Sequence, residues 1–366
     1  MINLALIKKI LDSTRLDRLE FQDVEKVNIH LSLGKVNFAE ILHSEVEEYI
    51  TFLYAFGKLY VIGFVGTICI IQTIDSPKVV SGDPNTCFQF CISKDKVKVL
   101  SNKEELMFLL KNNELSWIFK FGNGYLKKKM RPSKPFYDTK SYLSFLDSYY
   151  LEGSKGKVNI DDLRLYAKAL NVMTKNPMER NIVLGDGYLY SILPTFVIFK
   201  PNSTSLKEHL VINNTLLLCL PRKSIDMEIY MYRNFSALIN KENNIFYIFK
   251  SMSVNNLITP YTQLTINWVG DLNEDITKAI GVVSFGEQKE LSMTFEKNKV
   301  IITDMDSEDS KYIGECKTYV ESNYTLNINS IIKDIPKLSK IGKVTTEGKT
   351  HIIALLLEGG TLCLTR

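Results

Sequence analysis

The sequence has only four histidines and six cysteines in 366 residues, and neither residue type is clustered. The histidines form no HExxH pair and have no cysteine or carboxylate at ligand spacing, which argues against a zinc site. The cysteines form no CxxC pair and lie within apolar segments, which predicts reduced core thiols rather than a disulfide framework. The sequence therefore predicts neither a metal nor a cofactor.

The sequence also lacks a long hydrophobic run and a secretion signal. No stretch approaches the roughly eighteen uninterrupted apolar residues that a membrane span needs, and the start MINLALIKKILDS carries a charge by Lys8. With 45% hydrophobic residues, 23% charged residues and a formal net charge of +4, the composition indicates a globular protein of two or three domains. We expect a cytoplasmic protein with no membrane partner.

A phosphate-binding glycine loop is not evident either. Gly185 and Gly187 in VLGDGYLYS lack the G-x-G-x-x-G spacing and lie between two β-rich runs, which favours a hairpin turn. No G-x-x-x-x-G-K-[ST] motif is present, and no arrangement of Ser, His and Asp or of Cys and His can be argued from the sequence. We therefore expect a protein that is not an enzyme.

The acidic segment DMDSEDSKYIGE places carboxylates at positions 1, 3, 5 and 12 of a calcium-loop register, at Asp304, Asp306, Glu308 and Glu315. It lacks the glycine that such a loop has at position 6, and its flanks read as strands where the loop needs helices. We interpret residues 304–315 as an acidic hairpin loop. Whether this loop binds a cation is left open.

The sequence repeats itself at an ungapped shift of 128 residues. The shift lays FAEILHSEVEEYITFLYAFGKLYVIGFVGTICII, from Phe38, over YAKALNVMTKNPMERNIVLGDGYLYSILPTFVIF, from Tyr166. Both copies have apolar residues at helical spacing, over 38–49 in the first copy, and then two β-rich runs around a glycine turn. A third copy, from Asp275, keeps this order with the polar turn 296–299 and no glycine.

The second half of each copy repeats as well. LVINNTLLLCLPRK (210–223) and LNINSIIKDIPKL (326–338) each show a short β run, an N-cap residue, an apolar helical turn and a proline, and FCISKDKVKVLSN (90–102) is a degenerate version. The sequence predicts an α+β fold of three consecutive domains, each with antiparallel sheets and two short helices. The predicted domains are residues 1–133, which are divergent, 134–250 and 251–366.

Three consecutive units of this order resemble the bacterial DNA polymerase sliding clamp, the β subunit of the replicase. The best local matches are ALNVMTKNPMERNIVLGDGYLYS and the terminal IIALLLEGGTLCLTR. The resemblance implies a ring of two head-to-tail subunits around double-stranded DNA, opened by a clamp loader and tethering a DNA polymerase. Strong use of Asn, Lys, Ile and Tyr suits a low-GC genome. The divergence from the family suggests a phage version, in which case the location is the host cytoplasm. The alternative is a β-rich viral structural or assembly protein with no role in DNA sliding.

The resemblance also implies basic residues that face the hole and touch phosphates weakly, because tight or base-specific contacts would stop sliding. For any one such residue, the alternative is an ordinary solvated face. The helix predicted over 38–49 is acidic, so either it lies away from the hole or the first domain does another job. The candidates are Lys127, Lys128, Lys129, Arg131, Arg164, Lys168, Lys175, Arg222, Lys223, Lys333, Lys337 and Lys340, with Lys8, Lys9, Arg15 and Arg18 near the N-terminus.

Clamps of this kind bind short peptide tails of polymerases and loaders in an apolar pocket between domains two and three. The resemblance implies that this pocket is formed by residues from three segments: the end of the second unit's hairpin, the linker before the third unit, and the end of the sequence. These residues are Leu193, Pro194, Thr195, Met252, Val254, Leu362 and Leu364. The alternation of Leu362 and Leu364 with polar or small neighbours is also typical of any half-buried strand.

Overall fold

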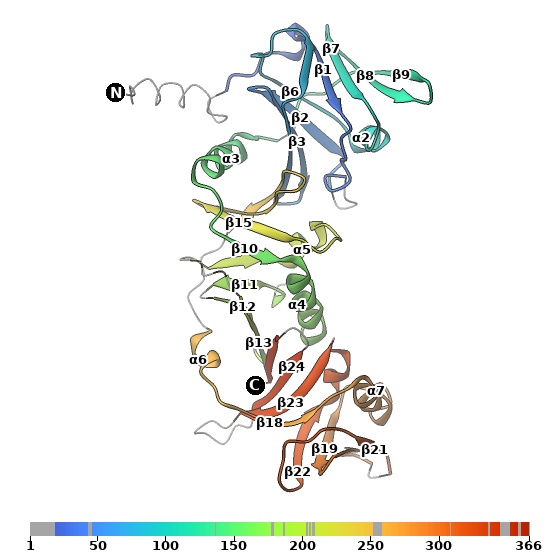
Figure 1. Ribbon diagram of the computed structural model, residues 1–366, viewed down its shortest axis with the longest axis vertical. Coiled ribbons are helices and arrows are strands. Elements are labelled where there is room, and N and C mark those ends of the chain that lie inside the picture. The colour runs from blue at the N-terminus through green and yellow to red at the C-terminus, as the bar shows by residue number, and fades with distance from the viewer. Residues whose placement is uncertain are drawn as a thin grey trace, which may run out of the picture. The chain divides into compact units, whose positions relative to one another are not determined.

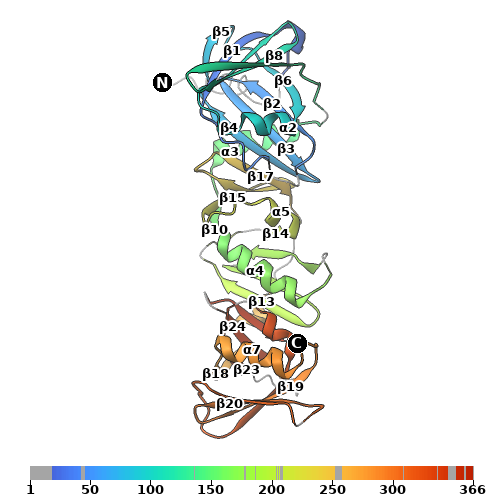
Figure 2. The ribbon, with the colours of Figure 1, turned by 90° about the vertical axis from the view of Figure 1, so that its right-hand side faces the viewer.

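The structure is a computed structural model that describes residues 19–42, 46–135, 137–176, 179–185, 187–202, 204, 206, 209–251, 258–307, 309–335, 337–344, 352–357 and 360–365. The chain forms two compact units (Figures 1 and 2). Unit 1 comprises Met1–Ile160 and Leu218–Ser251, and unit 2 comprises Asp161–Leu217 and Met252–Arg366.

The middle of the chain shows the structural repeat most completely. A strand and a helix precede a meander of three strands; a fourth strand, a short helix and three closing strands follow. The elements are β10 (Gly156–Asn159), α4 (Ile160–Met173), β11 (Ile182–Gly185), β12 (Tyr188–Ile192), β13 (Phe196–Pro201), β14 (Leu210–Ile212), α5 (Asn214–Cys219), β15 (Asp226–Tyr232), β16 (Phe235–Asn240) and β17 (Ile245–Lys250). The predicted hairpin turn is confirmed, since Gly185 pairs with Tyr188 and Gly187 has a φ of 77°.

The third repeat has the same order. Its first helix, α7, begins at an Asn273 cap whose side chain accepts a hydrogen bond from the Ile276 N–H at 2.9 Å. The predicted turn 296–299 is confirmed as a tight hairpin in which Asn298 has a φ of 59°. The elements are β18 (Ile266–Asp271), α7 (Glu274–Val283), β19 (Glu290–Glu296), β20 (Lys299–Asp304), β21 (Lys311–Glu315), β22 (Tyr324–Asn329), the 3-10 helix η4 (Ser330–Asp334), β23 (Leu338–Val344), β24 (Ile352–Leu357) and β25 (Leu362–Thr365).

The first repeat departs from this order at its first helix. Residues 39–42 form turns, β2 begins at Tyr49, and 43–45 lie outside the described residues, so the helix predicted over 38–49 is wrong. The elements are the 3-10 helix η2 (Val24–Lys26), β1 (Asn28–Gly34), β2 (Tyr49–Ala55), β3 (Lys58–Val65), β4 (Ile68–Asp75), β5 (Lys78–Ser81), β6 (Phe88–Ser93), α2 (Lys94–Leu100), β7 (Leu106–Lys111), β8 (Glu114–Phe121) and β9 (Gly124–Met130).

Apolar side chains explain the failure of that helix. Phe38 and Ile41 are fully buried, and the Phe38 ring packs edge-on against Phe52 with centroids 6.2 Å apart. Their spacing fits one helical turn, but the same two side chains are buried equally well from a turn that leads directly into β2. Tertiary packing therefore overrides the local helical pattern.

Two sheets continue from one repeat into the next. In unit 1 the strand order is β10-β15-β16-β17-β4-β3-β2-β6, and in unit 2 it is β14-β11-β12-β13-β25-β24-β23-β18. The joints are antiparallel pairs, with Tyr247 opposite Ile70 in unit 1 and Ile198 opposite Cys363 in unit 2. The sheets β5-β1-β7-β8-β9 and β21-β20-β19-β22 complete the two units. Because the continuous sheets group halves of different repeats, the compact units do not coincide with the predicted domains, and that division stays a prediction.

Corresponding faces of the two continuous sheets are covered by different elements. In unit 1 this face is covered by α3 (Lys140–Glu152) (Figure 1). Its Leu143 and Leu146 belong to the same buried cluster as Phe246 and Ile248 of β17. In unit 2 the corresponding face packs against residues near α6 (Thr259–Thr262), a helix of only four residues. The other face of the unit 2 sheet carries α4 (Figure 2). The Met173 sulfur of α4 lies 3.8 Å from the Cys363 sulfur of β25.

Candidate partner-peptide face and DNA-facing residues

The face of the unit 2 sheet opposite α4 is apolar, because alternate residues of each strand point to it. Leu364 lies opposite Val197, and Leu362 lies opposite Phe199 across the β13–β25 joint. Leu364, Val197 and Phe199 are at most 5% exposed, whereas Leu362 is half-buried. We call this surface the peptide face. The buried members are Val183, Tyr190, Val197, Phe199, Ile258, Val344, Ala354 and Leu364, and the half-buried ones are Tyr188, Ile192, Val211, Tyr261, Leu264, Ile266, Trp268, Ile352 and Leu362.

The peptide face has a polar group at one end. The Tyr190 hydroxyl lies 3.0 Å from His209 Nδ1, and both side chains are buried. A Cβ at Gly185 would lie 2.2 Å from the His209 ring, so only glycine accommodates the imidazole here. The glycine turn that the sequence singled out therefore holds a histidine and a tyrosine against this face rather than a phosphate.

The structure brings some of the predicted pocket residues together. Leu362 and Leu364 lie on the peptide face. Leu193, directly after β12, is buried but is not a member of this apolar cluster, while Pro194 and Thr195 are exposed in the following turn. Met252 and Val254 lie outside the described residues.

Sequence reasoning missed the aromatic members of the face, above all Tyr188 and Trp268. For Tyr188, a sequence signal was available: Tyr188, Tyr190 and Ile192 occupy alternate positions after the glycine turn, as residues on one face of a strand do. Trp268 gave no comparable signal, because β18 reaches this face only through its pairing with β23 at Gly342.

Two predicted DNA-facing residues, Arg164 and Lys168, lie four residues apart on α4, which places them along one stripe of the helix, while Leu163, Tyr166 and Leu170 are buried beneath. Lys175 lies in a bend beyond the end of α4. Lys168 and Lys175 are exposed, and the Arg164 side chain is 26% exposed with Nη1 3.4 Å from Asp161. This stripe is the described set that best matches the predicted role.

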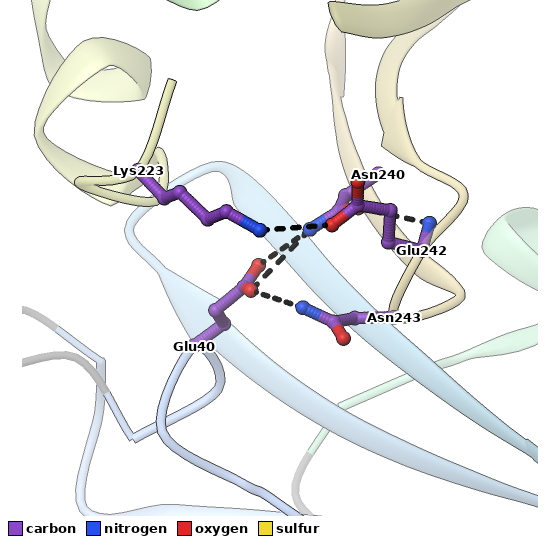
Figure 3. Close-up of polar contacts among 5 residues, drawn as sticks. All are labelled: Glu40, Lys223, Asn240, Glu242 and Asn243. Carbon is purple, nitrogen blue, oxygen red and sulfur yellow. Dashed lines mark hydrogen bonds and ion pairs between the residues drawn. The ribbon is translucent and has the colours of Figure 1, made fainter. Parts of the chain in front are cut away.

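Arg222 and Lys223 are exposed in the bend after α5. The Lys223 ammonium lies 3.5 Å from Glu242 in the β16–β17 turn (Figure 3). Lys96 and Lys98, which are not among the predicted residues, are exposed on α2, the helix of the first repeat that corresponds to α5. The internal repeat, which aligns FCISKDKVKVLSN with LVINNTLLLCLPRK, was the sequence signal that points to these two lysines.

Glu40, expected on an acidic helix, has a different role. Its carboxylate accepts a hydrogen bond from the Tyr247 hydroxyl at 2.6 Å. It also accepts hydrogen bonds from the Asn243 amide at 2.8 Å and the Asn240 amide at 3.3 Å (Figure 3). Burial, and then the negative charge of Glu40, raise the pKa of Tyr247. The turn that replaces the helix is thus fixed by its glutamate to the β16–β17 hairpin.

The predicted residues of the third repeat are dispersed. Lys333 donates to the Gly286 carbonyl at 3.0 Å, close to the C-terminal end of α7, where a lysine is favourable. Lys337 is exposed after η4 with a φ of 56°. Lys340 lies on β23, with its ammonium 5.1 Å from the centre of the Tyr319 ring. None of these three lysines lies on α7.

The remaining candidates lie on strand β9 or beside it, not on a helix. Lys127, Lys128 and Lys129 are exposed on β9, and Arg131 is exposed directly after it. Lys129 pairs with Glu114 at 2.7 Å. Lys8, Lys9, Arg15 and Arg18 lie outside the described residues. β9 is the last strand of the sheet β5-β1-β7-β8-β9, so its outer edge faces no other strand of that sheet.

The acidic loop lies between strands, as predicted, because β20 and β21 pair on either side of it. Asp304 is buried and accepts a hydrogen bond from the Lys289 ammonium, which lowers the pKa of this carboxyl. Glu308 lies outside the described residues. No group of three or more metal-binding side chains occurs among the residues that the structure describes. In that same part of the chain, no helix is long and apolar enough to cross a membrane.

Three α+β repeats joined by continuous antiparallel sheets, with helices against one face, define the sliding-clamp fold. The chain has this fold. Among solved structures, it is similar to the β subunits of bacterial DNA polymerase III. The sequence matches no protein-family model and no curated protein at a significant level.

The likeness extends over most of the chain. A putative DNA polymerase III β subunit from Eubacterium rectale gives a TM-score of 0.59 at 8% identity and covers 92% of this chain and 98% of that chain. The Streptococcus pneumoniae β chain gives 0.57 at 11% identity, with the same two coverages. The Helicobacter pylori clamp bound to a DNA ligase peptide gives 0.56 at 12% identity, covering 92% of this chain and 99% of that chain.

Proposed function

We propose that this chain is a DNA sliding clamp, a ring of two copies that encircles duplex DNA and tethers a replicative polymerase without catalysing a reaction. The observation that carries the proposal is the way the sheets continue between repeats. β4 pairs with β17 and β13 with β25. In each pair, the third strand of one repeat's meander lies beside the last strand of the next repeat.

One further meander-ending strand and one further repeat-ending strand lie at the edge of a sheet, with no neighbour on their outer side within the described sheets. β21 is the third strand of the meander β19-β20-β21, and β9 is the last strand of the first repeat. Unpaired edges of this kind invite pairing with another chain. In a dimer, β9 of each copy pairs with β21 of the other copy. These two intermolecular pairs close the six repeats into a ring.

The basic stripe of α4, together with Arg222 and Lys223, is proposed to face the DNA. These long side chains are mostly exposed and lie at helices or helix ends, so they reach phosphates through water without reading base edges. A contact of this kind depends on salt and leaves the ring free to slide.

The peptide face is proposed to bind short apolar segments of a polymerase and of the clamp loader. Its half-buried aromatic side chains are the residue types that anchor peptides at interfaces. The Helicobacter pylori clamp, which has the same fold, is described as bound to a DNA ligase peptide.

The first test is the mass in solution, measured by light scattering over a dilution series. A ring of two copies predicts a species of about twice 41.9 kDa that dissociates on dilution. A strict monomer at every concentration contradicts the ring.

The second test is topological. The protein is diluted to monomers, mixed with nicked circular plasmid and then concentrated, so that rings close around the DNA without a loader. Gel filtration should show protein that stays with the circle and leaves after a restriction enzyme linearises it. Equal behaviour on circular and linear DNA contradicts the clamp and favours the alternative, a β-rich viral structural protein.

A further inference from the structure

The face of the unit 1 sheet that α3 covers corresponds residue by residue to the peptide face of unit 2. The shift of 128 residues found in the sequence also relates the two sheets, because Cys69 lies opposite Ile248 just as Val197 lies opposite Leu364. The same apolar surface therefore occurs twice in the chain. The corresponding residues are Tyr60 and Tyr188, Ile62 and Tyr190, Phe64 and Ile192, Cys69 and Val197, and Ile71 and Phe199. We call the first member of each pair, together with Phe246 and Ile248, the unit 1 face.

α3 lies on the unit 1 face with one apolar side. The Tyr142 ring meets the Phe64 ring edge-on with centroids 5.7 Å apart, and the Tyr149 ring meets the Phe246 ring edge-on with centroids 5.2 Å apart. These contacts come from two turns of the helix and from two strands of the sheet, so α3 lies across the face rather than touching its rim. The buried members of α3 are Leu143, Phe145, Leu146 and Tyr149.

The presence of α3 accounts for the difference in exposure between the two faces. Phe64 and Phe246 are at most 4% exposed beneath α3. Their counterparts on the peptide face, Ile192 and Leu362, are half-buried. The unit 1 face thus has the appearance of the peptide face with an apolar helix already bound to it.

α3 has little stability as a helix of its own. It has 13 residues, a length at which an isolated helix is marginal in water. Its first turn contains Lys140 and no acidic residue, and its last turn contains Glu152 and no basic residue, which is the reverse of what the helix dipole favours. One hydrogen bond adds to the packing, from the Tyr149 hydroxyl to Glu228 at 3.1 Å. α3 is therefore held as a helix by its contacts with the face.

We propose that the unit 1 face is a second docking face for an apolar helix, that α3 occupies it as a tethered ligand, and that a partner helix of the same pattern binds there when α3 leaves. The pattern is two leucines three residues apart and an aromatic residue three residues further on, as at Leu143, Leu146 and Tyr149. A short tether gives α3 an effective concentration of about a millimolar, which a partner helix has to overcome. The inference concerns unit 1 alone and does not depend on the ring.

Cys69 reports whether α3 is in place, because its side chain is fully buried in the cluster that α3 completes. The test is the rate at which N-ethylmaleimide modifies Cys69, resolved from the other cysteines by mass spectrometry. The L143A/L146A variant should raise this rate at least about a hundredfold, because both removed side chains are fully buried. Cys219 is buried beside Tyr247, whose side chain points to the opposite side of β17 from Phe246, and its rate should change less than about threefold.

A synthetic peptide of residues 138–153 then replaces α3 from outside. At about 1 mM it should return the Cys69 rate of L143A/L146A to within about threefold of wild type. The same peptide with aspartate in place of both leucines should give no protection. Tyr149→Phe, which removes only the hydrogen bond to Glu228, should raise the Cys69 rate about tenfold, and it carries the same comparison if circular dichroism shows the double variant to be unfolded.

Modification that rises equally at Cys69 and Cys219 shows that the whole unit unfolds, and overturns the inference. A Cys69 that neither peptide protects, or that both protect equally, also overturns it, because the face then does not select the helix pattern. A chain that never dimerises contradicts the ring and leaves this result unaffected.

Discussion

The replacement of Glu40 by alanine tests how the first repeat is held together without its first helix. The Glu40 carboxylate is the acceptor for the Tyr247 hydroxyl at 2.6 Å, and Tyr247 is fully buried. Without that acceptor, the hydroxyl loses a charge-assisted hydrogen bond and stays away from bulk water. Such a bond contributes about 1.5–3 kcal/mol, and an unsatisfied buried donor costs about 1–3 kcal/mol. Because Glu40 itself is half-buried and water can partly replace it, we expect a loss of about 2 kcal/mol.

The assay is urea unfolding of unit 1 followed by tryptophan fluorescence. The chain has two tryptophans, Trp117 buried in unit 1 and Trp268 in unit 2, so the W268F background reports unit 1 alone. Glu40→Gln keeps an acceptor oxygen and should lose only about half as much. Glu48→Ala, a neighbouring exposed glutamate with no side-chain partner in the described structure, is the matched control and should change stability by less than about 0.5 kcal/mol.

A double-mutant cycle isolates the pair. Tyr247→Phe removes the donor, so in the Glu40→Ala background it should cost about 1 kcal/mol less than in wild type. If Glu40→Ala unfolds at the same urea concentration as Glu48→Ala, the carboxylate does not fix the turn to the β16–β17 hairpin.

Three further predictions concern unit 2 and the DNA. Lys168→Glu should lower the salt dependence of DNA retention: the slope of log K against log[salt] should become shallower by about 0.9 per lost phosphate contact, hence by about 2 per ring. The same reversal at Lys250, exposed at the end of β17, should leave the slope unchanged. Leu362→Asp should abolish the change in Trp268 fluorescence on adding the polymerase C-terminal peptide, while the mass of the dimer stays unchanged. If the variant binds the peptide as well as wild type does, the peptide face is not the binding site. Lys289 lowers the pKa of Asp304 below its ordinary 3.8, so their pair stabilises fully above that pH and is lost as pH falls through the folded-state pKa. Thermal unfolding should therefore show Lys289→Met less stable than wild type at about pH 6, with the difference shrinking at about pH 3; a difference that does not change with pH would contradict the pair.

Local patterns predicted the elements that carry their own signals. The tight turns at 185–187 and 296–299, the strands on both sides of the acidic loop, and α4 and α7 follow from glycine or asparagine at positive φ, from alternation and from apolar helical spacing. The order of these elements, repeated along the chain, was sufficient to indicate the fold class even though the sequence itself matches no family model.

The peptide face depended on pairings between distant residues. Leu362 and Leu364 were predicted as pocket residues, but Trp268 joins them only because β18, β23, β24 and β25 lie side by side in one sheet. Which residues share a face is set by register across strands far apart in sequence, and a pattern within one segment does not contain that register.

The sequence by itself determined three α+β repeats, the turns between their strands and the segments that are basic or acidic. Tertiary structure decided what each segment does. The turn at Glu40 replaces a helix because burial of Phe38 and Ile41 and the hydrogen bond to Tyr247 outweigh a helical pattern. The lysines of β9 lie on a free sheet edge rather than on a helix because β9 ends its sheet. Local propensity amounts to tenths of a kcal/mol per residue, whereas burial and pairing of whole strands contribute several, and the larger contribution decides.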